Sequence, residues 1–138
     1  MRITIILILT IICSCRNSKN VSSTDKVGLF KIIKVGSLNN WHIIYATKND
    51  TLFKIVSKKE ENVDSNCNKI NGGQYYNLKI HSRKENPPEI NGIKLSPVNY
   101  IDITCYSFDA NTSICIEPKK GIYDLYFAEN LKGLCLEK

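Results

Sequence analysis

The chain has 138 residues, a formal net charge of +6, a hydrophobic fraction of 43% and a charged fraction of 23%. This length fits one domain, and this composition excludes a wholly disordered chain. No segment recurs at the spacing of a solenoid, so a repeat array is excluded too.

The chain opens with a short apolar run behind one positive residue, Arg2. Residues 3–12 are almost entirely isoleucine, leucine and threonine. At about 1.5 Å per residue, a helix of this length is too short to cross a hydrocarbon core of about 30 Å. The run therefore predicts the hydrophobic region of a secretory signal rather than a membrane-spanning helix or a buried core segment.

The end of the run, Ile12-Cys13-Ser14-Cys15, resembles the lipobox of bacterial lipoproteins. The resemblance implies that Cys15 receives a diacylglyceryl group and that the signal peptide is cut between Ser14 and Cys15. Cys13 is the alternative acceptor, but Ile12 before it is too bulky for the small position of that motif. Two or three acyl chains hold a protein on a membrane far more firmly than one.

Composition adds to this resemblance. Lysine greatly outnumbers arginine, and isoleucine and asparagine are abundant, as in proteins from AT-rich genomes. With its Cys-Ser-Cys signal end, the sequence resembles small lipoproteins of Bacteroidetes-type bacteria. In that group, acidic residues soon after the lipid cysteine mark export to the cell surface, and residues 16–20 contain none. The resemblance thus implies a lipid anchor in the outer membrane, on its periplasmic side.

Three regions follow from these features. Residues 1–14 are expected to be the signal peptide, and residues 15–26 a polar, flexible tether. Residues 27–138 are expected to form a single extracytoplasmic β-rich domain.

Isoleucine, valine, tyrosine and threonine are common in that domain and alanine is rare, which favours strands. A first strand is predicted at residues 28–35, followed by a loop over 36–40. Residues 41–47 and 51–57 predict a hairpin around Asn49-Asp50. Both of its arms are apolar on two faces, which indicates a closed barrel or a covered sheet.

The second half continues the pattern. Residues 75–81 alternate as a strand, a long loop covers 82–97, and further strands are expected near 100–106 and 114–116. A short helix is predicted from Asp124 through Asn130, because Leu125, Ala128 and Leu131 recur at helical spacing. The predicted fold is mainly β: a small antiparallel barrel, OB-like, or a two-sheet sandwich, with one short C-terminal helix.

Four cysteines remain in the domain, and an even number in an exported chain predicts disulfides. Cys105 and Cys115 lie on two arms of one expected hairpin. If Ile103 and Ile114 share its apolar face, however, Cys115 faces away from Cys105. The preferred pairing is therefore Cys67–Cys105 with Cys115–Cys135. The spacings lack a CxxC pair, so no metal and no cofactor are expected.

No pattern marks a catalytic site. There is no G-x-S-x-G elbow and no phosphate-binding glycine loop, and His42 and His81 would each need a carboxylate or nucleophile beside them. The scattered lysines indicate a solvated surface or attraction to anionic lipid or polysaccharide, not nucleic acid. Five tyrosines are expected either in the core or in an aromatic patch: Tyr75, Tyr100, Tyr106, Tyr123 and Tyr126.

The leading hypothesis is a lipid-anchored, non-catalytic envelope protein that binds a protein, a glycan or another envelope component. The alternative is a small envelope hydrolase with dispersed catalytic residues. A cleft joining a histidine to a carboxylate would favour the hydrolase, and an exposed apolar or lysine-rimmed patch would favour the binding protein.

Overall fold

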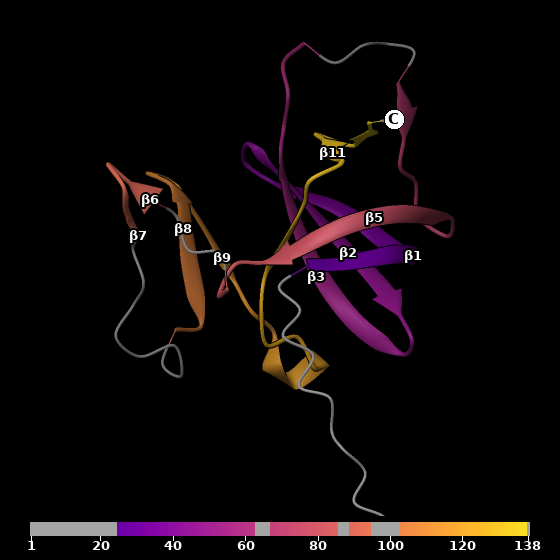
Figure 1. Cartoon of the computed structure of the whole chain (residues 1–138), viewed down its shortest axis with the longest axis horizontal. Helices are drawn as coiled ribbons and strands as arrows, with labels where there is room; N and C mark the ends of the chain where they lie inside the picture. Colours follow the sequence, from indigo (N-terminus) through magenta and orange to yellow (C-terminus); the bar gives the residue numbers. More distant parts are fainter. Residues whose placement is uncertain (1–24, 63–66, 86–88, 95–102, 138) are drawn as a thin grey trace, which may run out of the picture.

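The computed structural model describes residues 25–62, 67–85, 89–94 and 103–137. Its centre is a closed five-stranded barrel, which confirms the predicted mainly-β barrel class (Figure 1). The barrel strands are β1 (Asp25–Leu38), β2 (Trp41–Lys48), β3 (Thr51–Lys58), β5 (Tyr75–Ser82) and β10 (Tyr126–Ala128).

The strands follow one another around the barrel in the order β1-β2-β3-β10-β5, and β1 pairs with β5 to close it. All neighbours are antiparallel except β3 and β10, which pair in parallel at Ile55 and Tyr126. Counted along the chain, the order is first, second, third, fifth, fourth. This is the Greek-key order of an OB-like barrel.

The length of β1 makes closure possible. Its first half pairs with β5 and its second half with β2, and the register shifts between Ile32 and Lys34. The extra residue at this bulge, Ile33, bends the strand from one neighbour to the other. The predicted loop at residues 36–40 is shorter in the structure, because Gly36 to Leu38 still pair with β2 and only a two-residue turn follows.

The predicted hairpin of β2 and β3 is confirmed, with its turn at Asn49 and Asp50. Both turn residues have positive φ, 49° and 58°. A two-residue hairpin turn with this backbone matches the twist of the strands, and asparagine and aspartate tolerate it better than other side chains.

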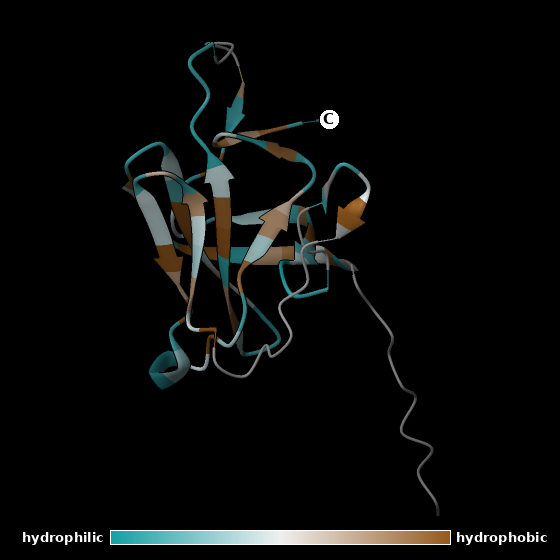
Figure 2. Ribbon diagram, turned by 90° about the vertical axis from the view of Figure 1, so that its left-hand side faces the viewer, coloured by the Kyte–Doolittle hydropathy of each residue, from teal (hydrophilic) through white to brown (hydrophobic). Residues whose placement is uncertain are grey.

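Two hydrophobic cores explain why this hairpin is apolar on both faces. Ile44 and Ile55 point into the barrel, whereas their neighbours Ile43 and Val56 point outward. The outward pair packs under a second hairpin, formed by β8 (Cys105–Asp109) and β9 (Thr112–Cys115), which lies against the barrel (Figure 1). Figure 2 shows how hydrophobic segments recur along the strands. The inner core comprises Phe30, Ile32, Ile44, Ala46, Phe53, Ile55, Ile70, Leu78, Ile80 and Leu131.

Smaller elements complete the domain. A three-stranded sheet packs on the inner core through Ile70 and Leu131. Its strands are β4 (Asn68–Lys69), β11 (Leu131–Lys132) and β12 (Cys135–Leu136), and the remaining elements are β6 (Glu89–Ile90), β7 (Ile93–Lys94) and the 3₁₀ helix η1 (Pro118–Lys120). The described residues contain no helix with the length and hydrophobicity needed to cross a bilayer.

The predicted C-terminal helix is wrong. Residues 123–125 have no regular secondary structure, and Tyr126–Ala128 form β10 between β5 and β3. Leu125 is buried in the outer core, while Tyr126 and Ala128 pack on the inner core. The barrel offers this segment strand partners on both sides, and a helix of two turns is too short to compete with them. The segment still closes the fold, as a strand.

Asp25 and Lys26, which were expected in the tether, pair with β5 and so belong to the barrel. The expected signal peptide, Cys15 and residues 16–24 lie outside the described residues, as do Tyr100 and the start of the strand predicted near it.

The four cysteines form two disulfides, but the predicted pairing is wrong. The bonds are Cys67–Cys135 and Cys105–Cys115. Cys105 lies directly opposite Cys115 in the β8–β9 ladder, and Ile114 lies opposite Tyr106. The apolar face of this hairpin therefore follows Tyr106 rather than Ile103, which leaves both cysteines on the other face.

Tryptic mapping without reductant distinguishes the two pairings. Cleavage after lysine places Cys67 in peptide 60–69, Cys135 in peptide 133–138, and both Cys105 and Cys115 in peptide 95–119. We expect peptide 60–69 joined to 133–138, with 95–119 closed on itself. A single species holding all three peptides would instead restore the sequence-based pairing.

Candidate binding surface

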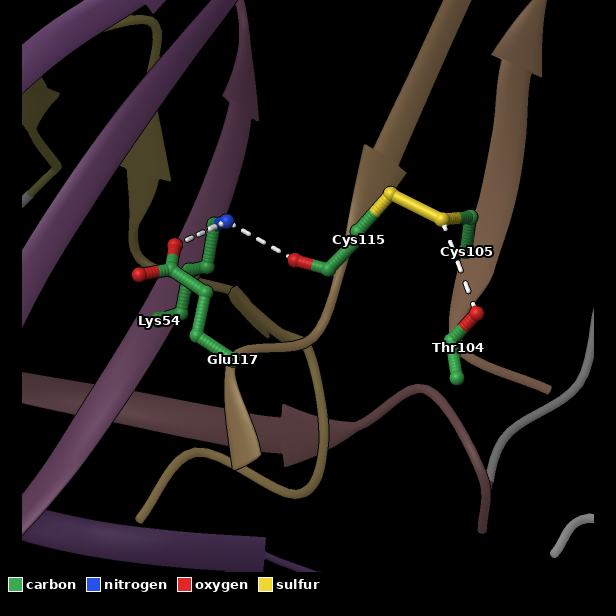
Figure 3. Close-up of a disulfide and its surroundings, with 5 residues drawn as sticks. All are labelled: Lys54, Thr104, Cys105, Cys115 and Glu117. Carbon is green, nitrogen blue, oxygen red and sulfur yellow. Dashed lines mark hydrogen bonds and ion pairs between the residues drawn. A yellow bond between two sulfur atoms is a disulfide. The ribbon is translucent and has the colours of Figure 1, made fainter. Parts of the chain in front are cut away.

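The β8–β9 hairpin covers one face of the barrel, and an ion pair between the buried Lys54 and the half-buried Glu117 links the hairpin to β3 (Figure 3). Lys54 on β3 is only 6% exposed. Its ammonium lies 2.5 Å from Glu117 Oε1 and donates to the Cys115 carbonyl oxygen at 2.8 Å. A buried ammonium needs such partners, because desolvation without them is costly.

The Glu117 carboxylate also accepts hydrogen bonds from Tyr45 and Lys120. The Tyr45 hydroxyl donates to Oε1 at 2.5 Å, and Lys120 pairs with the other carboxylate oxygen. Burial opposes ionisation of this carboxyl, but hydrogen bonds from Lys120, Lys54 and Tyr45 outweigh it and lower the pKa of Glu117 to about 2. Burial of the phenol, reinforced by its hydrogen bond to Glu117, raises the pKa of Tyr45 to about 12.

These shifts predict an acid-sensitive contact. The pKa of Glu117 falls from 4.5 to about 2 on folding, so its contribution is full above pH 4.5 and is lost as pH falls toward about 2. We expect the unfolding midpoint in denaturant to decline across this window. The decline should be shallower in Glu117→Gln, and an equal slope in both proteins would contradict the assignment.

The opposite edge of the same hairpin is fixed by aromatic rings. The Arg83 guanidinium lies 5.4 to 5.7 Å from the ring centres of Tyr106, Phe108 and Phe127. Burial lowers the pKa of Arg83. Trp41 donates from Nε1 to Asp109 Oδ2 at 2.7 Å. The hairpin is thus held at both edges and over its apolar centre.

The β8–β9 hairpin covers the outer face of β2 and β3. In OB barrels, the corresponding face of the second and third strands binds oligonucleotides and oligosaccharides. Here that face is filled by Ile114, Leu125 and the half-buried rings around them. The hairpin would have to leave before a ligand could use it.

The face of β1 and β5 carries an exposed apolar stripe. Val27, Leu29 and Lys31 point outward at alternate positions of β1, and Tyr75 lies opposite Lys31 on β5. The Lys31 ammonium sits 5.8 Å from the centre of the Tyr75 ring. We call this surface the β1 face; its large apolar members and exposed fractions are Val27 60%, Leu29 57%, Ile33 50% and Tyr75 58%.

Two lysines lie on the β1 face: Lys31, and Lys79 opposite Val27, which pairs with Glu129. Strands β1, β2 and β5 contain five lysines and one acidic residue, Asp25. Lys26 lies over the rings of Phe53 and Tyr126, and Lys48 donates to the Val27 carbonyl oxygen at 2.5 Å. The start of β1 therefore has exposed aliphatic groups on its outer side, while Lys26 and Lys48 contact inner-core rings on its other side.

The two histidines lie apart from each other. His81 Nδ1 is 3.3 Å from Glu129 Oε1, and Lys79 pairs with the same carboxylate. The hydrogen bond from Lys79 is the main cause of the lowered pKa of Glu129. Burial, followed by the charges of Lys59 and Lys69, lowers the pKa of His42.

A serine beside His81 does not join it. The Ser82 hydroxyl is buried and donates to Asp124, whereas His81 points to the other face of β5. A hydrolytic serine would need its histidine within hydrogen-bond reach. The pairs Ser82–Asp124 and His81–Glu129 are therefore separate.

The tyrosines do not form one patch. Tyr126 and Tyr106 are half-buried in packing, and Tyr75 and Tyr123 are exposed on different elements. Among the described residues, no cluster of three or more histidine, cysteine or acidic side chains could hold a metal ion. The four cysteines are bonded in pairs, so they offer no thiolate ligands.

Shallow hollows lie at the far end of β3, near Glu60 and Lys132. One of about 210 Å³ includes Trp41 and Phe127 in its lining, and another of about 250 Å³ borders the Cys67–Cys135 disulfide. Their walls mix lysine and glutamate, so they show no single charge preference.

The sequence-based prediction named Tyr75 as a possible patch residue and Lys31 as surface charge, but it did not predict the β1 face. The outward alternation of Val27 and Leu29 is visible in the sequence, but their exposure depends on which face of the barrel the β8–β9 hairpin covers. No protein-family model, no curated protein and no solved structure matches this chain, so the candidate surface stands on its own geometry.

Proposed function

We propose that the mature chain is a lipid-anchored, non-catalytic envelope protein that binds a protein or another envelope component. Cys15 carries the acyl chains, and the domain stands on the periplasmic side of the outer membrane. The observation that carries the binding role is the β1 face, an exposed apolar surface with Lys31 beside Tyr75 that no other described element covers.

The disulfides support the location. Both bonds lie within the domain, and such bonds persist in oxidising compartments outside the cytoplasm. The lipobox resemblance at residues 12–15 supplies the anchor, and Asp25, the first residue of β1, follows Cys15 by ten residues.

A small hydrolase is the second candidate, and one pair favours it. His81 and Glu129 lie within reach of each other. However, Glu129 is shared with exposed Lys79, and the neighbouring Ser82 faces away. This arrangement resembles a surface ion pair more than a general base held in place by a carboxylate.

Loss of the acceptor thiol tests the anchor. Cys15→Ser is expected to abolish labelling by radioactive palmitate and to leave the chain unprocessed or released from the membrane fraction. Cys13→Ser is the matched control and should keep full labelling. Undiminished labelling of Cys15→Ser would show that Cys13 is the acceptor or that the motif is not a lipobox.

A further inference from the structure

We propose that the β1 face docks on the surface of the membrane that holds the anchor, with Val27, Leu29 and Tyr75 at the level of the headgroups and Lys31 against anionic lipid. The proposal rests on the anchored location proposed above and names the envelope component that this face binds.

The start of β1 is the described part of the fold nearest in sequence to the lipid anchor. Asp25 begins β1, and Val27 and Leu29 follow within four residues. The ten residues from Cys15 to Asp25 can reach at most about 35 Å, even when fully extended. The anchor therefore holds the start of β1 close to the lipid surface at high effective concentration.

The side chains of the β1 face have the chemistry of a membrane-interface surface. Exposed aliphatic side chains flanked by lysine and a tyrosine suit the membrane interface, where apolar groups enter and ammonium groups meet phosphate. Lys31 lies over the Tyr75 ring, beside Leu29 on the same strand. Lys31 is the ammonium of this face that would meet anionic headgroups, because Lys79, opposite Val27, pairs with Glu129.

The β1 face is exposed, whereas the neighbouring face of the barrel is covered by the protein itself. The outer face of β2 and β3 is already filled by the β8–β9 hairpin, whereas Val27, Leu29 and Ile33 remain at least half exposed. Docking through β1 would thus bury Val27, Leu29 and Ile33, three of the large apolar residues that the fold leaves exposed. It would also leave the β8–β9 hairpin accessible to other molecules.

The test places a tryptophan on the β1 face of the mature chain. Cys15 is the single cysteine of the mature chain outside the two disulfides, so its thiol can be coupled to a maleimide lipid in vesicles. Leu29→Trp reports on the β1 face. Leu38→Trp is the matched control, nine residues further along the same strand, or about 30 Å. The unsubstituted chain gives the background from Trp41.

Quenching by lipids brominated in their acyl chains gives the readout. We expect Leu29→Trp to be quenched about threefold more than Leu38→Trp in vesicles containing phosphatidylglycerol. The difference should shrink in phosphatidylcholine alone, in high salt, and when Lys31→Glu is added. Equal quenching at both positions would overturn the proposal.

Two other outcomes identify other occupants of the face. A blue shift of Leu29→Trp that grows with protein concentration without vesicles, and no lipid quenching, would assign the face to a second copy and overturn membrane docking. Protection of Leu29→Trp only after envelope proteins are added would assign it to a protein partner, with the same consequence. Because chemical coupling bypasses cellular acylation, failure to dock is distinct from failure of Cys15 to be lipidated.

Discussion

Leu131→Ala is expected to lower the free energy of unfolding by about 2–5 kcal/mol, the cost of emptying a buried leucine site. Leu131 is buried in the inner core, although it belongs to the two-residue strand β11 near the end of the chain. Ile70 joins it there from the segment after β4. The side chain therefore ties the terminal sheet to the barrel, and its loss leaves a cavity between them.

Denaturant unfolding of the mature chain measures this loss. Leu38→Ala is the matched control, because Leu38 is a leucine at the exposed end of β1, and its truncation should change stability by no more than about 0.5 kcal/mol. If Leu131→Ala unfolds at the same midpoint as the unsubstituted chain, the terminal sheet is peripheral and does not close the fold.

Glu117→Ala is expected to cost about 3 kcal/mol, because it leaves the Lys54 ammonium buried without its carboxylate. The Cys115 carbonyl would remain as its hydrogen-bond acceptor, and the Tyr45 hydroxyl would lose its own. The loss falls on the contact that holds the β8–β9 hairpin to β3. The free energy of unfolding in denaturant measures it.

Two further variants make this result specific. Lys120 contacts the same carboxylate from an exposed position, so Lys120→Ala should cost well under about 1 kcal/mol. Replacing the pair together, as Lys54→Met with Glu117→Leu, should recover most of the stability, because no buried charge remains. An equal loss from Lys120→Ala and Glu117→Ala would place the effect on surface charge instead.

Much of the barrel could be predicted from local patterns. The β2–β3 hairpin followed from two apolar runs around Asn49-Asp50, and the alternation of residues 75–81 placed Leu78 and Ile80 inside, as found. The two-sided burial of the hairpin also indicated a barrel or a covered sheet, and the structure has both. These features depend on neighbours in sequence, which is why the sequence carries them.

The two wrong predictions, the C-terminal helix and the disulfide pairing, concern features that depend on strand pairing. Leu125, Ala128 and Leu131 recur at helical spacing, but strands β3 and β5, over forty residues earlier in the chain, draw this segment into the sheet. The predicted disulfide pairing was wrong because it placed Ile103 on the same face of the β8–β9 hairpin as Ile114. In the structure Tyr106 lies opposite Ile114, and Cys105 lies opposite Cys115.

The candidate site was predictable only in its parts. Lys54 stands between apolar neighbours on β3, a hint of a buried charge, but nothing in the sequence points to Glu117, 63 residues away. The β1 face depends in the same way on which side of the barrel the β8–β9 hairpin covers.

Intact mass spectrometry of the protein, extracted from the membrane fraction of a bacterium that makes it, tests the central claim most directly. The account predicts a chain that begins at Cys15, bears a diacylglyceryl group on that residue, and contains two disulfides with no thiol open to alkylation. An unacylated chain that begins elsewhere, or a chain whose Cys67, Cys105, Cys115 and Cys135 are all alkylated without reductant, would contradict it.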